Sequence, residues 1–356
     1  MAKEKILVIN PGSTSTKVAM YEEDRQLWLE SVNHSREELK DIPHPFDQFD
    51  LRKKVVLNCM EMHGETLKDV SAVVSRGGCL PPVRAGAYEI TDLMVETLRD
   101  HPVDMHAANV GSAVALDLAR SAGVKAYIYD ALTVDEMLPV TTITGLKGVR
   151  RPARGHNLNT RAAALKVCRD KGVAYSEKTI IVAHLGGGIT VNLHSKGQII
   201  DVIMDEEGPF SPERSGGVPN RALISMCFDH GYTRADVNRT LERSGGMVSW
   251  FGTSDMREVQ KMIDEGNEEA ALVFEAMALN TAKNIAKIAP TADGKIDFII
   301  LTGGLAYSER FVSAVKSHVE FLAPIIVAPG EKEMDALAGG TLRVLRGEEK
   351  ARIFEG

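Results

Sequence analysis

The sequence predicts an α/β protein made of two duplicated domains, each with a mixed five-stranded sheet flanked by helices. Near the N-terminus an apolar strand leads through a polar Gly/Ser/Thr turn into two further strands, and the same order returns in the second half of the chain. After each set, helical stretches alternate with strands. Such an alternation is typical of α/β domains, and a repeat this long indicates duplicated domains rather than a solenoid.

The first half begins with a strand at Lys5–Ile9 and the turn Asn10–Ser15. Apolar residues recur with helical spacing over Ala107–Ala122, and Gly123 is a typical helix stop. The remaining predicted strands of this half cover Thr16–Tyr21, Gln26–Val32, Ala72–Ser75 and Ala126–Tyr129.

The second half repeats the pattern with a strand at Thr179–Ala183 and the turn His184–Gly188. A long helix over Glu269–Ala289 is stopped by Pro290, and a last helix covers Ala336–Arg346. The remaining predicted strands are Ile189–Leu193, Gln198–Ile203, Asp297–Leu301 and Pro324–Val327.

The domain boundary is expected in a Gly/Pro/Arg-rich stretch, Thr144–Arg154. This gives an N-terminal domain at 1–148 and a C-terminal, nucleotide-binding domain at 149–334, with the active site in the cleft between them. The C-terminal helix, within 335–356, is expected to return to the first domain.

Composition and charge exclude several classes of protein. A net charge of −7 argues against a nucleic-acid or anionic-membrane surface. The apolar run Ile6–Ile9 is too short for a signal peptide, and no run reaches the roughly 18 apolar residues of a membrane span. The four cysteines are widely scattered, which favours reduced, packed thiols. We therefore expect a cytoplasmic protein that binds neither nucleic acid nor membrane.

Two glycine-containing turns are candidates for phosphate binding. In Asn10-Pro-Gly-Ser-Thr-Ser15, backbone N–H groups and the hydroxyls of Ser13 and Ser15 can converge on phosphate oxygens, with Lys17 in reach. No Gly-Lys-Ser/Thr follows, so this is not a Walker A loop. His184-Leu-Gly186-Gly187-Gly188 holds the matching place in the second half, and its glycines suggest a close backbone approach. The alternative for the first turn is a simple hairpin.

Other candidates follow predicted strands. Gly303 and Gly304 lie at a strand's carboxyl end, where an adenosine can pack against backbone, although they could equally form a helix-entry turn. Arg76 and Arg214 are predicted in loops and suit phosphoryl transfer, unless they are solvated surface charges. Asp130 is a candidate Mg²⁺ ligand or a helix N-cap before Ala131–Met137.

Two glutamates and three further arginines complete the candidates. Glu331 and Glu333 offer a second Mg²⁺ contact, or simply form a solvated face. The arginines Arg150, Arg151 and Arg154 come just before His156. Sequence patterns of zinc hydrolases and serine hydrolases (HExxH, Gly-x-Ser-x-Gly) are absent.

Five short blocks occur in an order that resembles the acetate and butyrate kinase family. They are Ile6–Lys17, Ser75–Gly78, Ala183–Gly188, Glu213–Gly216 and Leu301–Gly304. The resemblance implies the actin/hexokinase/heat-shock-70 (ribonuclease H-like) fold, the cofactor pair Mg²⁺ and ATP, and a homo-oligomer.

The resemblance also implies roles for single residues. Asn10, Ser13 and Ser15, with Lys17, would bind the phosphate end of ATP, as would His184 and Gly186 to Gly188. Arg76, Arg214 and His156 would surround the transferring phosphoryl group. Asp130 and one of Glu331 or Glu333 would hold Mg²⁺, and Gly303 with Gly304 the adenosine.

Three departures from the acetate kinase pattern resemble the butyrate kinase branch of the family. Ser75-Arg76-Gly77-Gly78 replaces Val-His-Gly-Gly, Arg154-Gly-His-Asn-Leu-Asn159 replaces Phe-His-Gly-Thr-Ser, and Gly187 replaces an asparagine. The expected reaction is the reversible phosphorylation of butyrate by ATP to butyryl phosphate and ADP. Acetate, propionate and isobutyrate are alternative acceptors; a non-catalytic nucleotide switch and a phosphatase are alternative functions.

Overall fold

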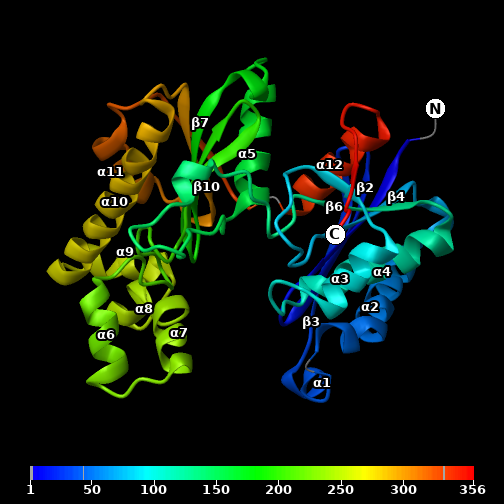
Figure 1. Ribbon diagram of the computed structural model, residues 1–356, viewed down its shortest axis with the longest axis horizontal. Helices are drawn as coiled ribbons and strands as arrows, with labels where there is room; N and C mark the ends of the chain where they lie inside the picture. The colour runs from blue at the N-terminus through cyan, green and yellow to red at the C-terminus, as the bar shows by residue number, and fades with distance from the viewer. Residues whose placement is uncertain (1–2, 43, 332) are drawn as a thin grey trace. The chain divides into compact units, whose positions relative to one another are not determined.

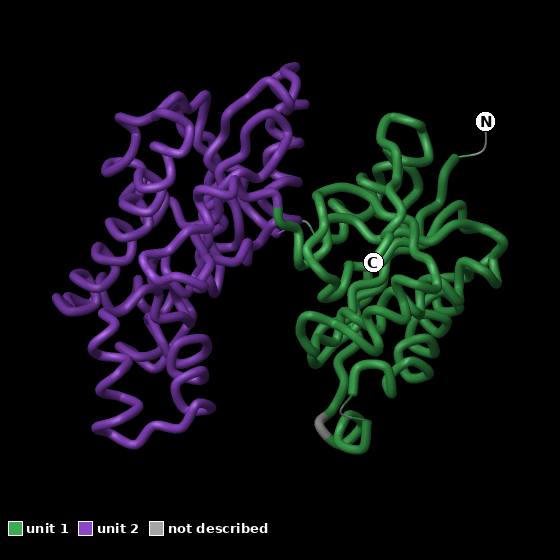
Figure 2. Tube along the Cα trace, viewed as in Figure 1, with its two compact units in different colours: residues 1–135, 332–356 green, residues 136–331 purple. Residues whose placement is uncertain are grey.

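The computed structural model describes residues 3–42, 44–331 and 333–356. The chain forms two compact units (Figure 2): unit 1 comprises 1–135 and 332–356, and unit 2 comprises 136–331. The units thus divide at 135/136 and 331/332, whereas the sequence led us to expect 148/149 and 334/335. The segment after residue 135 is attached to the sheet of unit 2, as described below.

Unit 1 is built on a sheet with strand order β12-β5-β6-β4-β1-β2-β3. The first three strands form an antiparallel meander, and β4 and β6 run parallel to β1. We expected five strands, but this sheet has seven. The two additional strands, β5 and β12, are three and two residues long, too short for alternation to mark them. The strand bounds are β1 Lys5–Pro11, β2 Ser15–Glu22, β3 Arg25–Asn33, β4 Ala72–Arg76, β5 Ala87–Glu89, β6 Lys125–Tyr129 and β12 Arg352–Ile353.

Helices cover the sheet of unit 1, with α2 to α4 on one side and α12 on the other (Figure 1). The predicted helix at Ala107–Ala122 is confirmed as α4, whose apolar stripe of Val110, Val114 and Leu118 is buried in the core. Gly123 ends it in the left-handed conformation, at φ 71°. The helix bounds are α1 Arg36–Lys40, α2 Phe49–Met62, α3 Asp92–Asp100, α4 Ala108–Ala122 and α12 Glu333–Leu345.

Unit 2 repeats the same arrangement, with strand order β11-β10-β7-β8-β9. Here too, three antiparallel strands are joined by two strands parallel to the first. This order matches β6-β4-β1-β2-β3 of unit 1, so the predicted duplication of an α/β domain is confirmed. The strand bounds are β7 Thr179–Leu185, β8 Ile189–Ser195, β9 Gln198–Ile203, β10 Phe298–Gly303 and β11 Ile325–Pro329.

Alternate residues of the unit 2 strands face two separate cores. Ile181 and Ala183 of β7 belong to the larger core beneath α10 and α11, whereas Ile180 and Val182 face the smaller core beneath α5. This period of two is what a sheet covered on both faces requires. The helix bounds are α5 Asn157–Asp170, α6 Asn220–Phe228, α7 Arg234–Glu242, α8 Gly246–Phe251, α9 Met256–Asp264, α10 Glu268–Ile288 and α11 Glu309–Val319.

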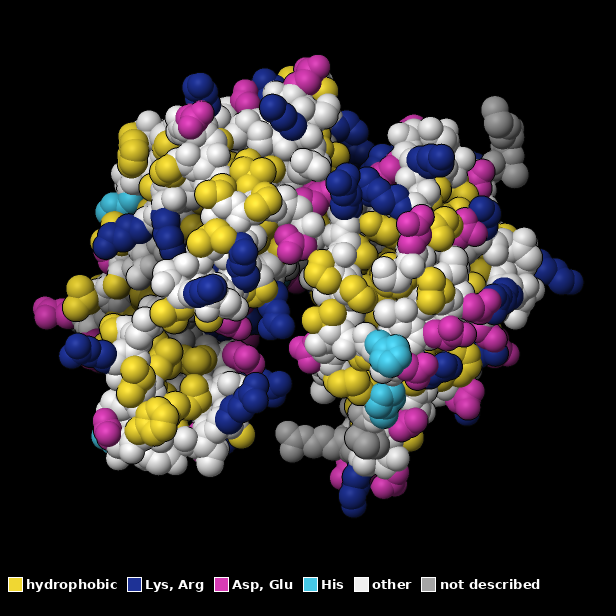
Figure 3. Space-filling view, viewed as in Figure 1, with side chains coloured by type: hydrophobic (Ala, Val, Ile, Leu, Met, Phe, Trp, Pro, Cys, Tyr) yellow, Lys and Arg dark blue, Asp and Glu magenta, His cyan; other side chains and the backbone are white. Residues whose placement is uncertain are grey.

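The short helices α6 to α8 carry exposed apolar side chains, visible in the space-filling view (Figure 3). Phe228 is 83% exposed, and Ile224 and Trp250 are each 57% exposed. Among the described residues, no helix is both long enough and apolar enough to cross a bilayer. Cys227 is exposed as well, so the prediction of packed thiols holds only for the other three cysteines.

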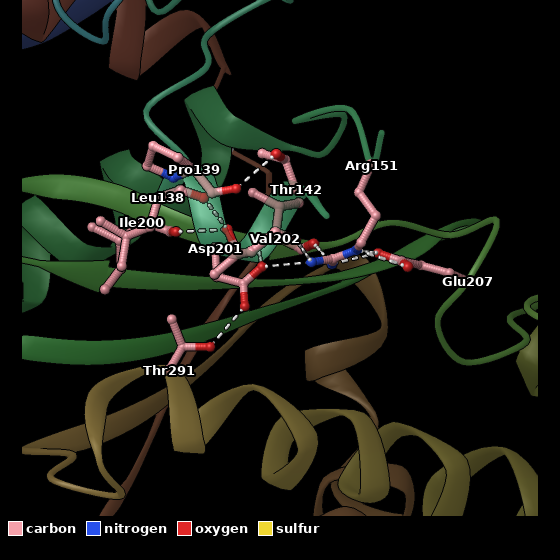
Figure 4. A network of polar contacts seen from close by, with 10 residues as sticks. Leu138, Pro139, Thr142, Arg151, Ile200, Asp201, Val202, Glu207 and Thr291 are labelled. Carbon is pink, nitrogen blue, oxygen red and sulfur yellow. Dashed lines mark hydrogen bonds and ion pairs between the residues drawn. The ribbon is translucent and has the colours of Figure 1, made fainter. Parts of the chain in front are cut away.

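Arg151 fastens the beginning of unit 2 to β9 (Figure 4). Its guanidinium group donates to Asp201 at 3.1 Å, to the carbonyl oxygens of Thr141 and Val202, and to both oxygens of Glu207. Asp201 also accepts a hydrogen bond from the Thr291 hydroxyl at 2.9 Å. Arg151 is therefore neither a solvated charge nor a phosphate-binding group in this structure. Its role is structural, because it holds the first segment of unit 2 against β9.

Candidate active site

Three functional side chains meet at one edge of the unit 1 sheet. The strands β1, β4 and β6 are parallel neighbours, so their carboxyl ends lie together. Asn10 lies at the end of β1, Arg76 ends β4, and Asp130 follows β6. Ligands of open α/β sheets bind outside such strand ends. This edge is the candidate site of unit 1.

Glu333 links two of these residues. Arg76 donates from Nη1 to Oε1 of Glu333 at 2.6 Å, and Asn10 donates from Nδ2 to Oε2 at 2.8 Å. Glu333 is the first residue of α12, so the returning helix carries it to the sheet edge. Arg76 thus already binds a carboxylate in this structure, which is the chemistry that a carboxylate substrate would require of it.

Asp130 has a strained backbone and a buried side chain. Its φ is 45°, in the left-handed region, and the residue is 3% exposed. Its Oδ1 accepts a hydrogen bond from the Gly86 amide at 2.7 Å. The predicted helix at Ala131–Met137 does not form, so the N-cap interpretation of Asp130 is wrong. An N-cap residue has an extended backbone, which the turn at Asp130 does not have.

The carboxylates of the candidate sites provide oxygen ligands of the kind that Mg²⁺ prefers. Within the described ranges, no group of three or more His, Cys, Asp or Glu side chains is placed to hold a metal ion. Asp130 and Glu333 lie in unit 1, and Glu331 lies in unit 2. Mg²⁺ is commonly bound by one or two carboxylates together with water and substrate phosphates. Asp130 and Glu333 of unit 1 fit that pattern.

The turn between β1 and β2 is open to solvent. Ser13 and Thr14 are exposed, while Ser15 is half-buried at the start of β2. Asn10 and Lys17 are directly paired across the two strands, so their side chains lie on the same face of the sheet. Lys17 is exposed and can reach a phosphate held at this turn.

Two stacked histidines form the centre of the candidate site of unit 2. The rings of His156 and His184 are 4.0 Å apart with an interplanar angle of 16°. His156 Nδ1 is 3.0 Å from the Thr190 hydroxyl, and His184 Nε2 lies 3.3 Å from Oε1 of Glu331. His184 is buried, and among the described residues neither of its ring nitrogens makes a hydrogen bond. A buried polar group of this kind is typical of functional sites.

The three glycines of the second turn are needed because side chains of the protein itself cover them. A Cβ on Gly187 would lie 2.9 Å from the Glu213 carboxylate, and one on Gly188 would lie 2.8 Å from Arg214 Nε. The Ser211 hydroxyl and the Glu213 amide both bond to the Gly187 carbonyl, at 2.6 and 3.1 Å. The loop that carries Arg214 therefore lies directly over the glycine turn.

Arg214 is held by Asp205 and is partly buried. The two side chains form an ion pair, and Nε of Arg214 has no hydrogen-bond partner among the described residues. Burial lowers the pKa of Arg214, against the charge of Glu242, which raises it. The guanidinium group remains charged at neutral pH and is placed to meet an anion at the glycine turn.

Gly303 and Gly304 lie beside the His184–Gly188 turn, because Thr302 of β10 pairs with His184 of β7. Gly303 has a φ of 91°, and a Cβ there would lie 2.4 Å from the Leu185 carbonyl oxygen. A Cβ on Gly304 would meet nothing within 4 Å. The space beside Gly304 is where an adenosine was predicted.

Several residues of the two halves were not predicted from the sequence. Asp205 and Thr190 contact the predicted residues Arg214 and His156 only through the fold, and no local pattern marks them. His106 lies just before α4. Its pKa is lowered by burial and by the positive charge of Arg76. His106 is therefore close to Arg76 and neutral at pH 7.

Most of unit 2 is similar to a known protein family. Residues 154–328 match the model of the acetokinase family. The matching stretch contains the stacked histidines, the glycine turn, Arg214 and the Gly303–Gly304 pair.

Solved structures of acetate and propionate kinases share the fold of nearly the whole chain. The structure of Porphyromonas gingivalis acetate kinase superposes with a TM-score of 0.82 at 20% identity, covering 96% of this chain and all of that one. A propionate kinase from Francisella tularensis gives 0.74 at 16% identity, with 95% and 98% covered. The acetate kinase of Entamoeba histolytica gives 0.75 at 15% identity, with 95% and 99% covered. The actin/hexokinase-like two-domain fold is thereby confirmed.

Proposed function

We propose that this protein transfers the terminal phosphoryl group of ATP to a short-chain carboxylate, giving an acyl phosphate and ADP in a reversible reaction. The observation that carries the proposal is the position of Arg214 over the glycine turn, inside the stretch that matches the acetokinase family. Arg76 in unit 1 provides a second guanidinium group, already bound to a carboxylate.

The chemistry needs positioning and charge neutralisation more than acid–base catalysis. A carboxylate is ionised near pH 7, so its oxygen attacks the γ-phosphorus without a general base. The new P–O bond forms as the bond to the bridging oxygen breaks, and ADP leaves with that electron pair. Arg214, Arg76 and His156 would neutralise charge on the equatorial oxygens. Mg²⁺, held by Asp130 and by Glu333 or Glu331, would supply positive charge at the phosphate oxygens.

Nucleotide phosphates would be held by both glycine-containing turns. Asn10, Ser13, Ser15 and Lys17 would bind them in unit 1. His184 with the glycines of the second turn would do so in unit 2, where Gly303 and Gly304 would accommodate the adenosine. Two arrangements support this assignment: the open turn at Ser13 and the empty space beside Gly304.

Butyrate is our proposed acceptor, on the strength of the Ser75-Arg76-Gly77-Gly78 block. A Cβ on Gly77 would lie 2.8 Å from Ala131, and one on Gly78 would lie 2.5 Å from Asn109, so the block must pack closely here. Two methylene groups distinguish butyrate from acetate, worth roughly 1.6 kcal/mol or about 15-fold. Acetate, propionate and isobutyrate therefore remain acceptors to be compared directly.

We also propose a cytoplasmic homo-oligomer. The exposed apolar residues of α6 and α8, among them Phe228 and Trp250, support self-association. A monomer in light scattering at micromolar concentration would contradict the oligomer.

One assay tests the function. ATP, Mg²⁺, hydroxylamine and each of the four acids are combined, and the hydroxamate formed from acyl phosphate is measured. We expect most product with butyrate. Hydroxamate from none of the acids would favour a nucleotide switch, and phosphate release without an acid would favour a phosphatase-type activity.

Arg214→Ala tests the residue that carries the proposal. Loss of its charge should lower kcat about 100-fold or more, while ATP binding persists. Arg257→Ala is the matched control, because Arg257 of unit 2 is exposed and paired only with Asp255. Near-normal turnover of the Arg214 variant would overturn the assignment.

A further inference from the structure

A buried arginine lies beneath the turn between β1 and β2. Arg52 of α2 is 0% exposed. Its Nη2 donates to the Gly12 carbonyl at 2.9 Å, and its Nη1 donates to the Ser15 carbonyl at 2.6 Å and the Thr16 hydroxyl at 2.8 Å. Nε and Nη2 donate to Gln48 Oε1, at 3.2 and 2.8 Å. All five N–H groups of the guanidinium are used.

Every one of these acceptors is neutral. Within the part of the chain that the structure describes, no carboxylate hydrogen-bonds or ion-pairs with Arg52. Burial lowers the pKa of Arg52 to about 10, so the group keeps its charge at neutral pH. The neighbouring His34 contacts the Thr16 hydroxyl at 2.8 Å, and burial and the charge of Arg52 lower its pKa. An isolated buried charge is unfavourable, so it is normally balanced by an opposite charge.

The hydrogen bonds of Arg52 set the direction of the turn's peptide groups. In a trans peptide the N–H points opposite to the C=O. Because the Gly12 carbonyl points inward to Arg52, the N–H of Ser13 points away from it. Ser13 and Thr14 are the exposed residues of this turn. The turn therefore presents an amide donor to the outside with a positive charge behind it.

We propose that Arg52 is a positioning residue that shapes the Gly12–Ser15 turn for the terminal phosphates of ATP, whose negative charge balances its own. Arg52 acts through the turn and touches no substrate. The proposal rests on the proposed function for the identity of the anion. The dependence of polyphosphate binding on this buried charge can be tested without the carboxylate substrate.

Two substitutions distinguish the effect of the Arg52 charge from the effect of its hydrogen bonds on the shape of the Gly12–Ser15 turn. Arg52→Met removes the charge and the hydrogen bonds together. Gln48→Glu keeps an oxygen acceptor against Arg52 and supplies the missing negative charge inside the protein. A purely structural Arg52 would tolerate Gln48→Glu, since a carboxylate is a better partner for the guanidinium group. Arg120→Met is the matched control, because Arg120 of unit 1 is exposed and paired with Asp92.

Isothermal titration of the full chain with ATP and with pyrophosphate measures the effect. We expect affinity for both ligands to fall about tenfold or more in Arg52→Met and about fivefold in Gln48→Glu, with Arg120→Met unchanged. In steady-state assays, KM for ATP should rise while KM for the carboxylate changes less than twofold. If Arg52→Met fails to fold, Gln48→Glu decides alone.

Binding by Gln48→Glu within twofold of wild type would overturn the role of the charge. Binding by folded Arg52→Met within twofold would overturn the proposal entirely. Both results are independent of whether the protein makes an acyl phosphate. A wild-type protein that binds ATP and pyrophosphate but yields no hydroxamate would contradict the proposed function and leave the role of Arg52 standing.

Discussion

At the scale of single residues, buried charges are balanced in three different ways. Arg151 is paired with Asp201 and Glu207 and holds a segment in place. Arg214 is paired with Asp205 but keeps a donor unused. Arg52 has only neutral acceptors. Among the described residues, the three arginines thus contact two carboxylates, one carboxylate and none.

His194 is a buried residue whose protonation affects stability. Its Nδ1 contacts the Tyr175 hydroxyl at 2.8 Å, and the ring is fully buried in β8. Burial, and then the charge of Arg161, lower its pKa to about 3. The unfolded chain binds a proton near pH 6.5, whereas the folded protein does not until about pH 3. The stability that this histidine contributes is thus complete above pH 6.5 and is lost as the pH falls toward 3.

His194→Asn should make the protein less sensitive to acid. Asparagine offers an oxygen near Nδ1 but does not titrate. Between pH 7 and pH 5 the wild type should lose about 2 kcal/mol more free energy of unfolding than the variant. Urea unfolding at the two pH values measures this difference. An equal loss in both proteins would show that His194 is not the group that titrates.

Among the functional residues, those within local patterns were predictable. The Asn10–Ser15 and His184–Gly188 turns and the arginines Arg76 and Arg214 follow recognisable strands or lie in ordered blocks. Asp205 was not predictable, because only tertiary structure brings it to Arg214. Arg52 was not predictable either, because a charged residue in an amphipathic stretch is normally exposed to solvent.

At the scale of elements, the returning helix α12 is fitted closely to unit 1. It packs against β1, β4 and β6 and carries Glu333. Two adjacent glycines lie within it. A Cβ on Gly340 would lie 2.4 Å from the Tyr129 ring, whereas a Cβ on Gly339 would meet only Arg343, at 3.9 Å. Tyr129 in turn directly precedes Asp130.

These two glycines give a matched pair of substitutions. Gly340→Ala should destabilise the protein by about 1–3 kcal/mol, because the added methyl overlaps a buried ring. Gly339→Ala should stabilise it by about 0.4–1 kcal/mol, through lower entropy of the unfolded chain. Thermal and urea unfolding measure both. Effects of the same sign would contradict the packing of α12 on Tyr129.

Long, periodic elements were predicted well and short ones were not. The strand cores, α4 and α10 agree with their patterns within a few residues. The short β5 and β12 depend on pairing with β6 and with each other, which no local pattern records. The segment Ala131–Met137 has helical periodicity but forms a turn and a bridge between Val134 and Val83 instead. Tertiary pairing overrides local preference there.

At the scale of the whole molecule, duplication explains why both units carry a candidate phosphate-binding turn. Each turn joins the first two strands of a sheet with the same strand order. The first has serine hydroxyls with Arg52 beneath it, and the second has glycines with Arg214 above it. The proposed function therefore requires ATP to stabilise both units, with its phosphates at both turns and its adenosine at the proposed site in unit 2.

Trp28 allows the stabilisation of unit 1 to be measured separately. The chain has two tryptophans: Trp28 is 9% exposed in the core of unit 1, and Trp250 is 57% exposed in unit 2. In the Trp250→Phe variant, tryptophan fluorescence therefore reports the unfolding of unit 1 alone. Mg²⁺ and ATP at about 100 times Kd should stabilise the protein by about 2.7 kcal/mol and raise the urea midpoint reported by Trp28.

Adenosine is the control ligand, because it lacks the phosphates that unit 1 is proposed to hold. It should raise the midpoint seen by Trp28 far less than ATP does. An equal effect of both ligands would mean that unit 1 is stabilised only through cooperative unfolding with unit 2. ATP could instead raise the midpoint measured by circular dichroism and leave the midpoint reported by Trp28 unchanged. That result would show that unit 2 binds the nucleotide and that unit 1 does not bind its phosphates.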